Sequence, residues 1–121
     1  MDKHTSSYRK NVKNMLKINN IKYREYTQFC DTNNRITTFL IHLHNMKFRS
    51  IEINVYESHN CCRLFVYCIN DMVENEMIKL NYIKCCGENL VCAEFRENLE
   101  ELVKELLWLE FFGFENIKKA K

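Results

Sequence analysis

Proline is absent from this chain of 121 residues, and glycine occurs only twice, at Gly87 and Gly113. Two isolated glycines cannot form either of the glycine-rich loops that bind nucleotide phosphates, so phosphate binding of that kind is excluded. Turns must instead be built from Asn, Asp, Ser and His, which give weaker turn signals. Loop boundaries are therefore less sharply marked than the elements between them.

Long apolar runs are missing as well. No stretch of about 18 apolar residues occurs, and the first residues contain no apolar segment of signal-peptide length. We therefore expect a protein that is neither secreted by that route nor inserted in a membrane, and we expect it in the cytoplasm. In that compartment the seven cysteines are interpreted as reduced thiols rather than as a disulfide framework.

The composition is that of a globular protein, with 46% hydrophobic and 28% charged residues. A chain of this length has the common size of one domain and can bury a core of its own. Neither a linker nor an internal repeat is visible. The sequence thus predicts a single domain over residues 1–121.

Hydrophobic periodicity predicts a helix at each end and strands between them. Apolar residues recur at helical spacing over residues 8–21, and the period changes to two after Asn19 and Asn20. The last helix is the clearest, because Leu99, Val103 and further leucines follow helical spacing to Leu109.

Strands are predicted at residues 22–30, 35–44, 51–56, 61–69, 77–85 and 90–96. Residues 70–76 are interpreted as a loop or one helical turn, and a helix over 71–83 is the alternative to the fifth strand. The predicted fold is α+β, with an N-terminal helix, an antiparallel meander of about six strands and a C-terminal helix packed on the sheet.

Cysteine and histidine are the first candidates for chemistry. A zinc site is usually marked by C-x2-C or H-x3-H spacings, and neither is present. Adjacent residues such as Cys61 and Cys62 point to opposite faces of a strand, whereas His42 and His44 share a face and are weak candidates for metal ligands. Strand cysteines are expected to fill core positions, so we expect no catalytic residue, cofactor or resident metal.

Basic residues cluster near the start of the chain. The predicted patch on the first helix consists of Arg9, Lys10, Lys13 and Lys17. Lys22 and Arg24 follow in the sequence, and tyrosines of this region could stack on bases. The net charge of only +2 is low for a nucleic-acid-binding protein, and a solvated helix face is the other interpretation.

Aromatic residues cluster at the end of the last predicted helix, and the candidates for a protein interface are Trp108, Phe111, Phe112 and Phe114. One core-facing stripe does not accommodate all four, so a protein contact, including a homodimer, is one interpretation and core packing of at least two is the other. Glutamates gather between Glu94 and Glu110, opposite in sign to the basic start. Such a charge distribution suits orientation toward a charged protein partner.

These observations favour a non-enzymatic small binding protein that acts on another macromolecule, such as a phage or mobile-element inhibitor of a host defence protein or a toxin-immunity protein. A nucleic-acid-binding module using the basic N-terminal helix is one alternative, and a thiol- or metal-dependent enzyme is another. A protein partner is expected before a nucleic acid, and no membrane is expected.

Overall fold

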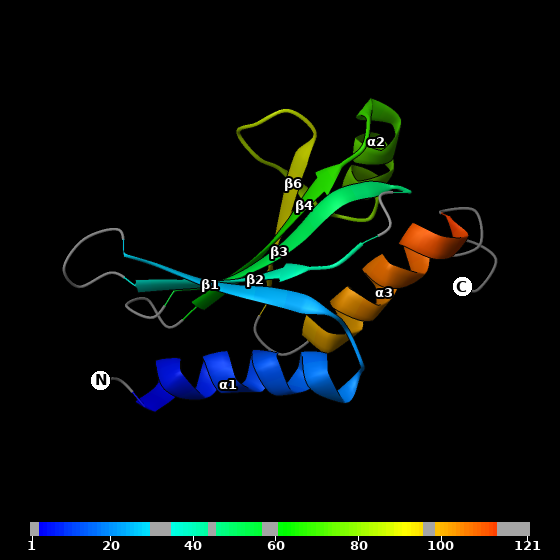
Figure 1. Cartoon of the computed structure of the whole chain (residues 1–121). Helices are drawn as coiled ribbons and strands as arrows, with labels where there is room; N and C mark the ends of the chain where they lie inside the picture. Colours follow the sequence, from blue (N-terminus) through cyan, green and yellow to red (C-terminus); the bar gives the residue numbers. More distant parts are fainter. Residues whose placement is uncertain (1–2, 30–34, 44–45, 57–60, 96–98, 114–121) are drawn as a thin grey trace.

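The computed structural model describes residues 3–29, 35–43, 46–56, 61–95 and 99–113. Its helices and strands are, in chain order, α1 (Lys3–Ile18), β1 (Tyr23–Phe29), β2 (Arg35–Ile41), β3 (Phe48–Tyr56), β4 (Cys61–Cys68), α2 (Asp71–Lys79), β5 (Ile83–Lys84), β6 (Leu90–Phe95) and α3 (Leu99–Phe112). The predicted α+β class, with one helix first and another last, is confirmed (Figure 1).

The strands form one six-stranded antiparallel sheet in the order β1-β2-β3-β4-β6-β5. The first four strands are a meander, as predicted, because each pairs with the next along the chain. The order then departs from a simple meander: α2 separates β4 from β5, and β6 rather than β5 pairs with β4. The short β5 is left at the edge of the sheet.

Helix α2 corrects the interpretation of residues 70–76 as a loop or one helical turn and of the start of the strand predicted over 77–85, of which β5 (Ile83–Lys84) is extended and pairs with β6. The cause lies at Asn70, whose extended backbone and side-chain oxygen cap the helix by accepting the N–H of Val73 at 2.9 Å. Val73 and Met77 then stand one turn apart and are both buried. The helical alternative is therefore the correct one for this segment, up to Lys79.

The core lies between the sheet and the helices. Strand β3 contributes Ile51, Ile53 and Val55, as its alternation predicts, and α3 contributes the fully buried Val103 and Leu106. Figure 1 shows α1 and α3 on the same side of the sheet, so the predicted packing of the C-terminal helix is confirmed. None of the described helices is both long and apolar enough to cross a bilayer.

Candidate functional site

The face of the sheet turned away from α1 and α3 brings polar and aromatic side chains of several strands together. Opposed residues of neighbouring strands lie about 5 Å apart, so strand pairing defines rows across this face. One row is Arg24, Leu40, Glu52 and Phe65. The next row is Tyr26, Thr38, Asn54 and Arg63. We call the surface made by these two rows the open face.

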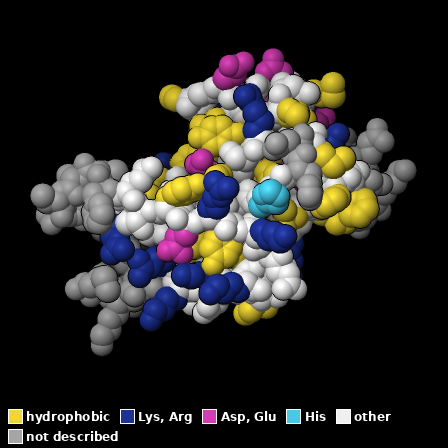
Figure 2. Space-filling view, in the orientation of Figure 1, with side chains coloured by type: hydrophobic (Ala, Val, Ile, Leu, Met, Phe, Trp, Pro, Cys, Tyr) yellow, Lys and Arg dark blue, Asp and Glu magenta, His cyan; other side chains and the backbone are white. Residues whose placement is uncertain are grey.

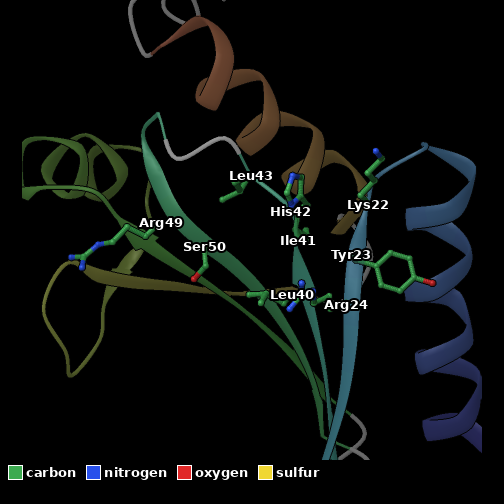
Figure 3. Close-up of a pocket in the computed structure, with 9 residues that line it drawn as sticks. All are labelled: Lys22, Tyr23, Arg24, Leu40, Ile41, His42, Leu43, Arg49 and Ser50. Carbon is green, nitrogen blue, oxygen red and sulfur yellow. The ribbon is translucent and has the colours of Figure 1, made fainter.

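A pocket of about 530 Å³ lies at one end of the open face, where β1, β2 and β3 meet (Figure 3). The charged residues among its described lining are Lys22, Arg24 and Arg49, and His42 lies between Lys22 and Arg49. Arg49 Nε donates to the backbone oxygen of Cys68 at 3.4 Å, and its guanidinium points away from Lys22 and Arg24 in Figure 3. Among the described residues, no Asp or Glu lines the pocket and no carboxylate forms an ion pair with Lys22 or Arg24. We call this hollow the basic pocket. An anion is the ligand that its charge favours.

The basic pocket opens on the side of the sheet away from α1. Figure 3 shows the side chain of Tyr23 pointing toward α1, whereas Arg24, Leu40 and Ser50 lie on the other side of their strands. This follows from the period of two along a strand, since Tyr23 and Arg24 are adjacent on β1. The pocket therefore opens on the open face, although Tyr23, Ile41 and Leu43, which lie in or against the core, are also among its lining residues.

A second hollow of about 350 Å³ continues along the open face. We call it the polar pocket, and its lining residues are Tyr26, Gln28, Ile36, Thr38, Leu40, Glu52 and Asn54. Leu40 lines both hollows, so the two adjoin. Together they offer cations at one end and amide, hydroxyl, carboxyl and aromatic groups at the other.

Two side chains of β3 set the hydrogen-bonding character of the polar pocket. Thr38 Oγ1 donates to Asn54 Oδ1 at 2.6 Å, which directs the amide so that its Nδ2 remains available as a donor. Glu52 is half-buried between Leu40 and Phe65, and burial raises the pKa of its carboxyl. No described donor forms a hydrogen bond with that carboxyl, so an acceptor and a donor lie side by side in the pocket.

Glu52 is expected to reduce stability at neutral pH. Its folded-state pKa lies above the ordinary value of 4.5, so the folded protein binds more protons than the unfolded chain between these two pKa values. Stability therefore falls as pH rises through that window. We expect Glu52→Gln to raise the Tm at pH 7 and to leave it nearly unchanged at about pH 4, where both side chains are neutral. Thermal unfolding followed by circular dichroism measures both values.

The matched control is Glu101→Gln, because Glu101 is exposed on α3. Its effect on the Tm should be small at both pH values. A lower Tm for Glu52→Gln than for the wild type at pH 7 would contradict the burial cost inferred for Glu52.

The basic patch predicted on the first helix lies on α1. Lys10 and Lys17 are exposed, Arg9 is half-buried, and Lys13 Nζ contacts Glu25 of β1 at 3.3 Å. Figure 2 shows Lys and Arg side chains gathered over α1 and β1 in the lower half of the view, whereas Asp and Glu are prominent at the α2 end. On the face that Figure 2 shows, most of the Lys and Arg side chains thus lie over α1 and β1.

The predicted aromatic cluster is divided. Trp108 packs against the core and its ring centroid lies 5.0 Å from that of Phe112. Phe111 and Phe112 are each 59% exposed, and Phe114 lies outside the described residues. Core packing therefore accounts for Trp108, while Phe111 and Phe112 present their rings to the surface.

Glu110, one of the glutamates gathered between Glu94 and Glu110, does not belong to the charged surface. It is only 1% exposed, and its Oε1 accepts the backbone N–H groups of Met46, Lys47 and Phe48. The sequence held a signal for this, because Glu110 follows Leu106 by four residues and so falls on the core-facing side of the helix.

The histidine and cysteine candidates do not converge. His42 lines the basic pocket, His44 lies outside the described residues, and no three His, Cys, Asp or Glu side chains of the described part are placed to hold a metal ion. Burial raises the pKa of Cys68 to about 12. Burial, followed by a hydrogen bond with Cys92, raises the pKa of Cys85 to about 12. Neither thiol is therefore ionised at neutral pH, as a nucleophile would need to be.

The sequence matches no protein-family model, and no curated protein or solved structure is significantly similar to it. A fold of this class by itself carries no function, because function resides in particular sites. Function is therefore inferred from the chemistry of the open face.

Proposed function

We propose that the chain is a non-enzymatic binding module whose open face holds a single-stranded nucleic acid. The observation that carries the proposal is the basic pocket, which adjoins a polar pocket on the same face of the sheet. Proteins that bind single strands combine cations along the phosphate backbone with rings on which bases stack. Phosphates would lie at Lys22, Arg24 and Arg49, and bases would lie toward the polar pocket.

Aromatic rings on the open face support this assignment. Tyr26 of β1 is 43% exposed, and Phe65 and Tyr67 of β4 are half-buried on the same face. Antiparallel sheets with aromatic residues on an uncovered face are an established platform for unpaired bases. A duplex hides the faces of its bases within the stack, so the rings favour a single strand.

Fluorescence anisotropy with labelled single strands of about 12 nucleotides tests the proposal. We expect binding at low salt and an affinity that falls as salt rises, with a log–log slope near −2 for about three phosphate contacts. RNA and DNA strands of the same sequence identify the preferred sugar, and a duplex of equal length should bind more weakly. No binding of either strand at low salt, or tighter binding of the duplex, would contradict the proposal.

The end of α3 favours a second binding function, the contact of the chain with another copy of itself. Met46 is 52% exposed, and its N–H donates to Glu110 near the end of α3, the helix that carries the exposed Phe111 and Phe112. Figure 2 shows hydrophobic side chains gathered at the right of the view, where α3 ends. Trp108, Phe111 and Phe112 stand at i, i+3 and i+4, and such a ridge on one helix can pair with its own copy about a twofold axis.

Light scattering after size exclusion tests this self-association. We expect the wild type to show the mass of a dimer and Phe111→Ser combined with Phe112→Ser to show that of a monomer, because two exposed rings are lost from the contact. Because both rings are exposed in a single copy of the chain, the monomeric variant should still unfold cooperatively. Ile18→Ser is the matched control, since Ile18 is 77% exposed on α1. A monomeric wild type, or dissociation caused equally by Ile18→Ser, would contradict the assignment.

A further inference from the structure

The polar pocket places an acceptor next to a donor. Glu52 and Asn54 lie two residues apart on β3, so their side chains share the open face about 7 Å apart along the strand. The Oδ1 of Asn54 is engaged by Thr38, which leaves Nδ2 as the donor. The carboxylate of Glu52 has two oxygens that only accept. A ligand group with two adjacent donors and an acceptor next to them would form hydrogen bonds with both residues, the donors with Glu52 and the acceptor with Asn54.

Among the bases, guanine offers this pattern. Its Watson–Crick edge carries the N1–H and N2–H donors side by side, with the O6 acceptor next to them. Adenine and cytosine each place a single amino donor beside an acceptor nitrogen, which a carboxylate repels, and uracil places one donor between two acceptors. We infer that the polar pocket is a guanine subsite in which Glu52 accepts from N1–H and N2–H while Asn54 donates to O6. This inference rests on the proposed function.

The surroundings of Glu52 strengthen such a contact. Leu40 on β2 and Phe65 on β4 are paired with it and withdraw its carboxyl from water. Hydrogen bonds to an ionised group are stronger than neutral ones, and more so where the local dielectric is low. Tyr26, which is exposed and lines the same pocket, offers a ring against which the base can stack.

Strands of about eight uridines with one central replacement test the subsite. We expect guanine to bind about 10-fold more tightly than uracil at that position, the effect of one good bidentate contact. Inosine lacks the N2 amino group but keeps N1–H and O6, so its affinity should fall between those of guanine and uracil. Adenine and cytosine should bind no more tightly than uracil. Anisotropy at one fixed salt concentration measures all five strands.

The substitution Glu52→Gln should reduce the guanine strand to the affinity of the uridine strand. Glu25→Gln is the matched control, because Glu25 lies on β1 opposite the buried Phe39 and contacts Lys13 of α1, on the other face of the sheet. That variant should keep the guanine preference, and cooperative thermal unfolding followed by circular dichroism should show that each variant is folded.

The outcomes separate the two claims. Binding of the uridine strand without a guanine preference, or a preference that survives Glu52→Gln, overturns the guanine subsite and leaves the proposed function standing. Binding of none of the strands overturns the proposed function and the subsite together. A ranking of guanine, then inosine, then the other bases, lost in Glu52→Gln and kept in Glu25→Gln, supports both.

Discussion

Replacing Glu110 with alanine is expected to lower the free energy of unfolding by about 3 kcal/mol, because a buried acceptor shared by one buried and two part-buried donors is lost. In the folded protein, Oε1 of Glu110 accepts the N–H groups of Met46, Lys47 and Phe48. Phe48 is fully buried, so its N–H has no access to water once the carboxylate is removed. Urea denaturation of the wild type and the variant measures the difference.

Two further variants serve as controls for the Glu110→Ala result. Glu110→Gln retains an acceptor oxygen at the same place, so its loss should be clearly smaller than that of the alanine variant. Glu101→Ala removes an exposed carboxylate from the same helix and should change the stability by less than about 0.5 kcal/mol. Equal stabilities of Glu110→Ala and the wild type would show that the three hydrogen bonds contribute nothing.

Glu110 also connects the core to the open face. Glu110 accepts the N–H groups of Lys47 and Phe48, and the next two residues in the chain, Arg49 and Ser50, line the basic pocket. The carboxylate of α3 therefore fixes the start of β3 and, through it, one wall of the pocket. We expect Glu110→Ala to weaken ligand binding as well as folding, although Glu110 lies on the core side of the sheet.

Local patterns in the sequence were enough for most of the architecture. The alternation of Ile51, Ile53 and Val55 predicts one buried face of β3, and the leucines of the last helix predict its packing. The error at α2 arose because residues 71–79 carry few apolar side chains, of which Val73 and Met77 alone are fully placed in the core. The cap at Asn70 was the signal that decides for a helix.

The candidate site could not be predicted in the same way, because it depends on strand register. Arg24, Leu40 and Glu52 are far apart in the sequence and become one row only through the pairing of β1 with β2 and of β2 with β3. The sequence places Lys22 and Arg24 on the strand predicted over residues 22–30, near the basic helix, but it does not show which residues of other strands lie beside them. A shift of the register by one residue would turn Arg24 toward the core, so no composition argument locates the pocket.

Reversing the charge at two positions of the basic pocket, Lys22→Glu with Arg24→Glu, is expected to weaken single-strand binding by about 100-fold at low salt. Each lysine or arginine that contacts a phosphate releases counterions, so the salt slope should also become shallower by about 0.7 per lost contact on a single strand. Both side chains are exposed and have no ion pair with a described carboxylate, so the fold should tolerate the change. Anisotropy titrations at several salt concentrations measure the affinity and the slope together.

The decisive control applies the same change of charge to the helix, as Lys10→Glu with Lys17→Glu. These lysines are exposed on α1, which packs on the other face of the sheet, so their reversal removes long-range attraction without removing a contact. We expect a smaller loss of affinity and a nearly unchanged salt slope, because screening weakens charges beyond about 10 Å at 0.1 M salt. A larger loss of affinity from the changes at Lys10 and Lys17 than from those at Lys22 and Arg24 would show that the nucleic acid binds at the basic helix. Equal losses would show that the basic pocket is not a specific binding site but one part of a diffuse positive surface.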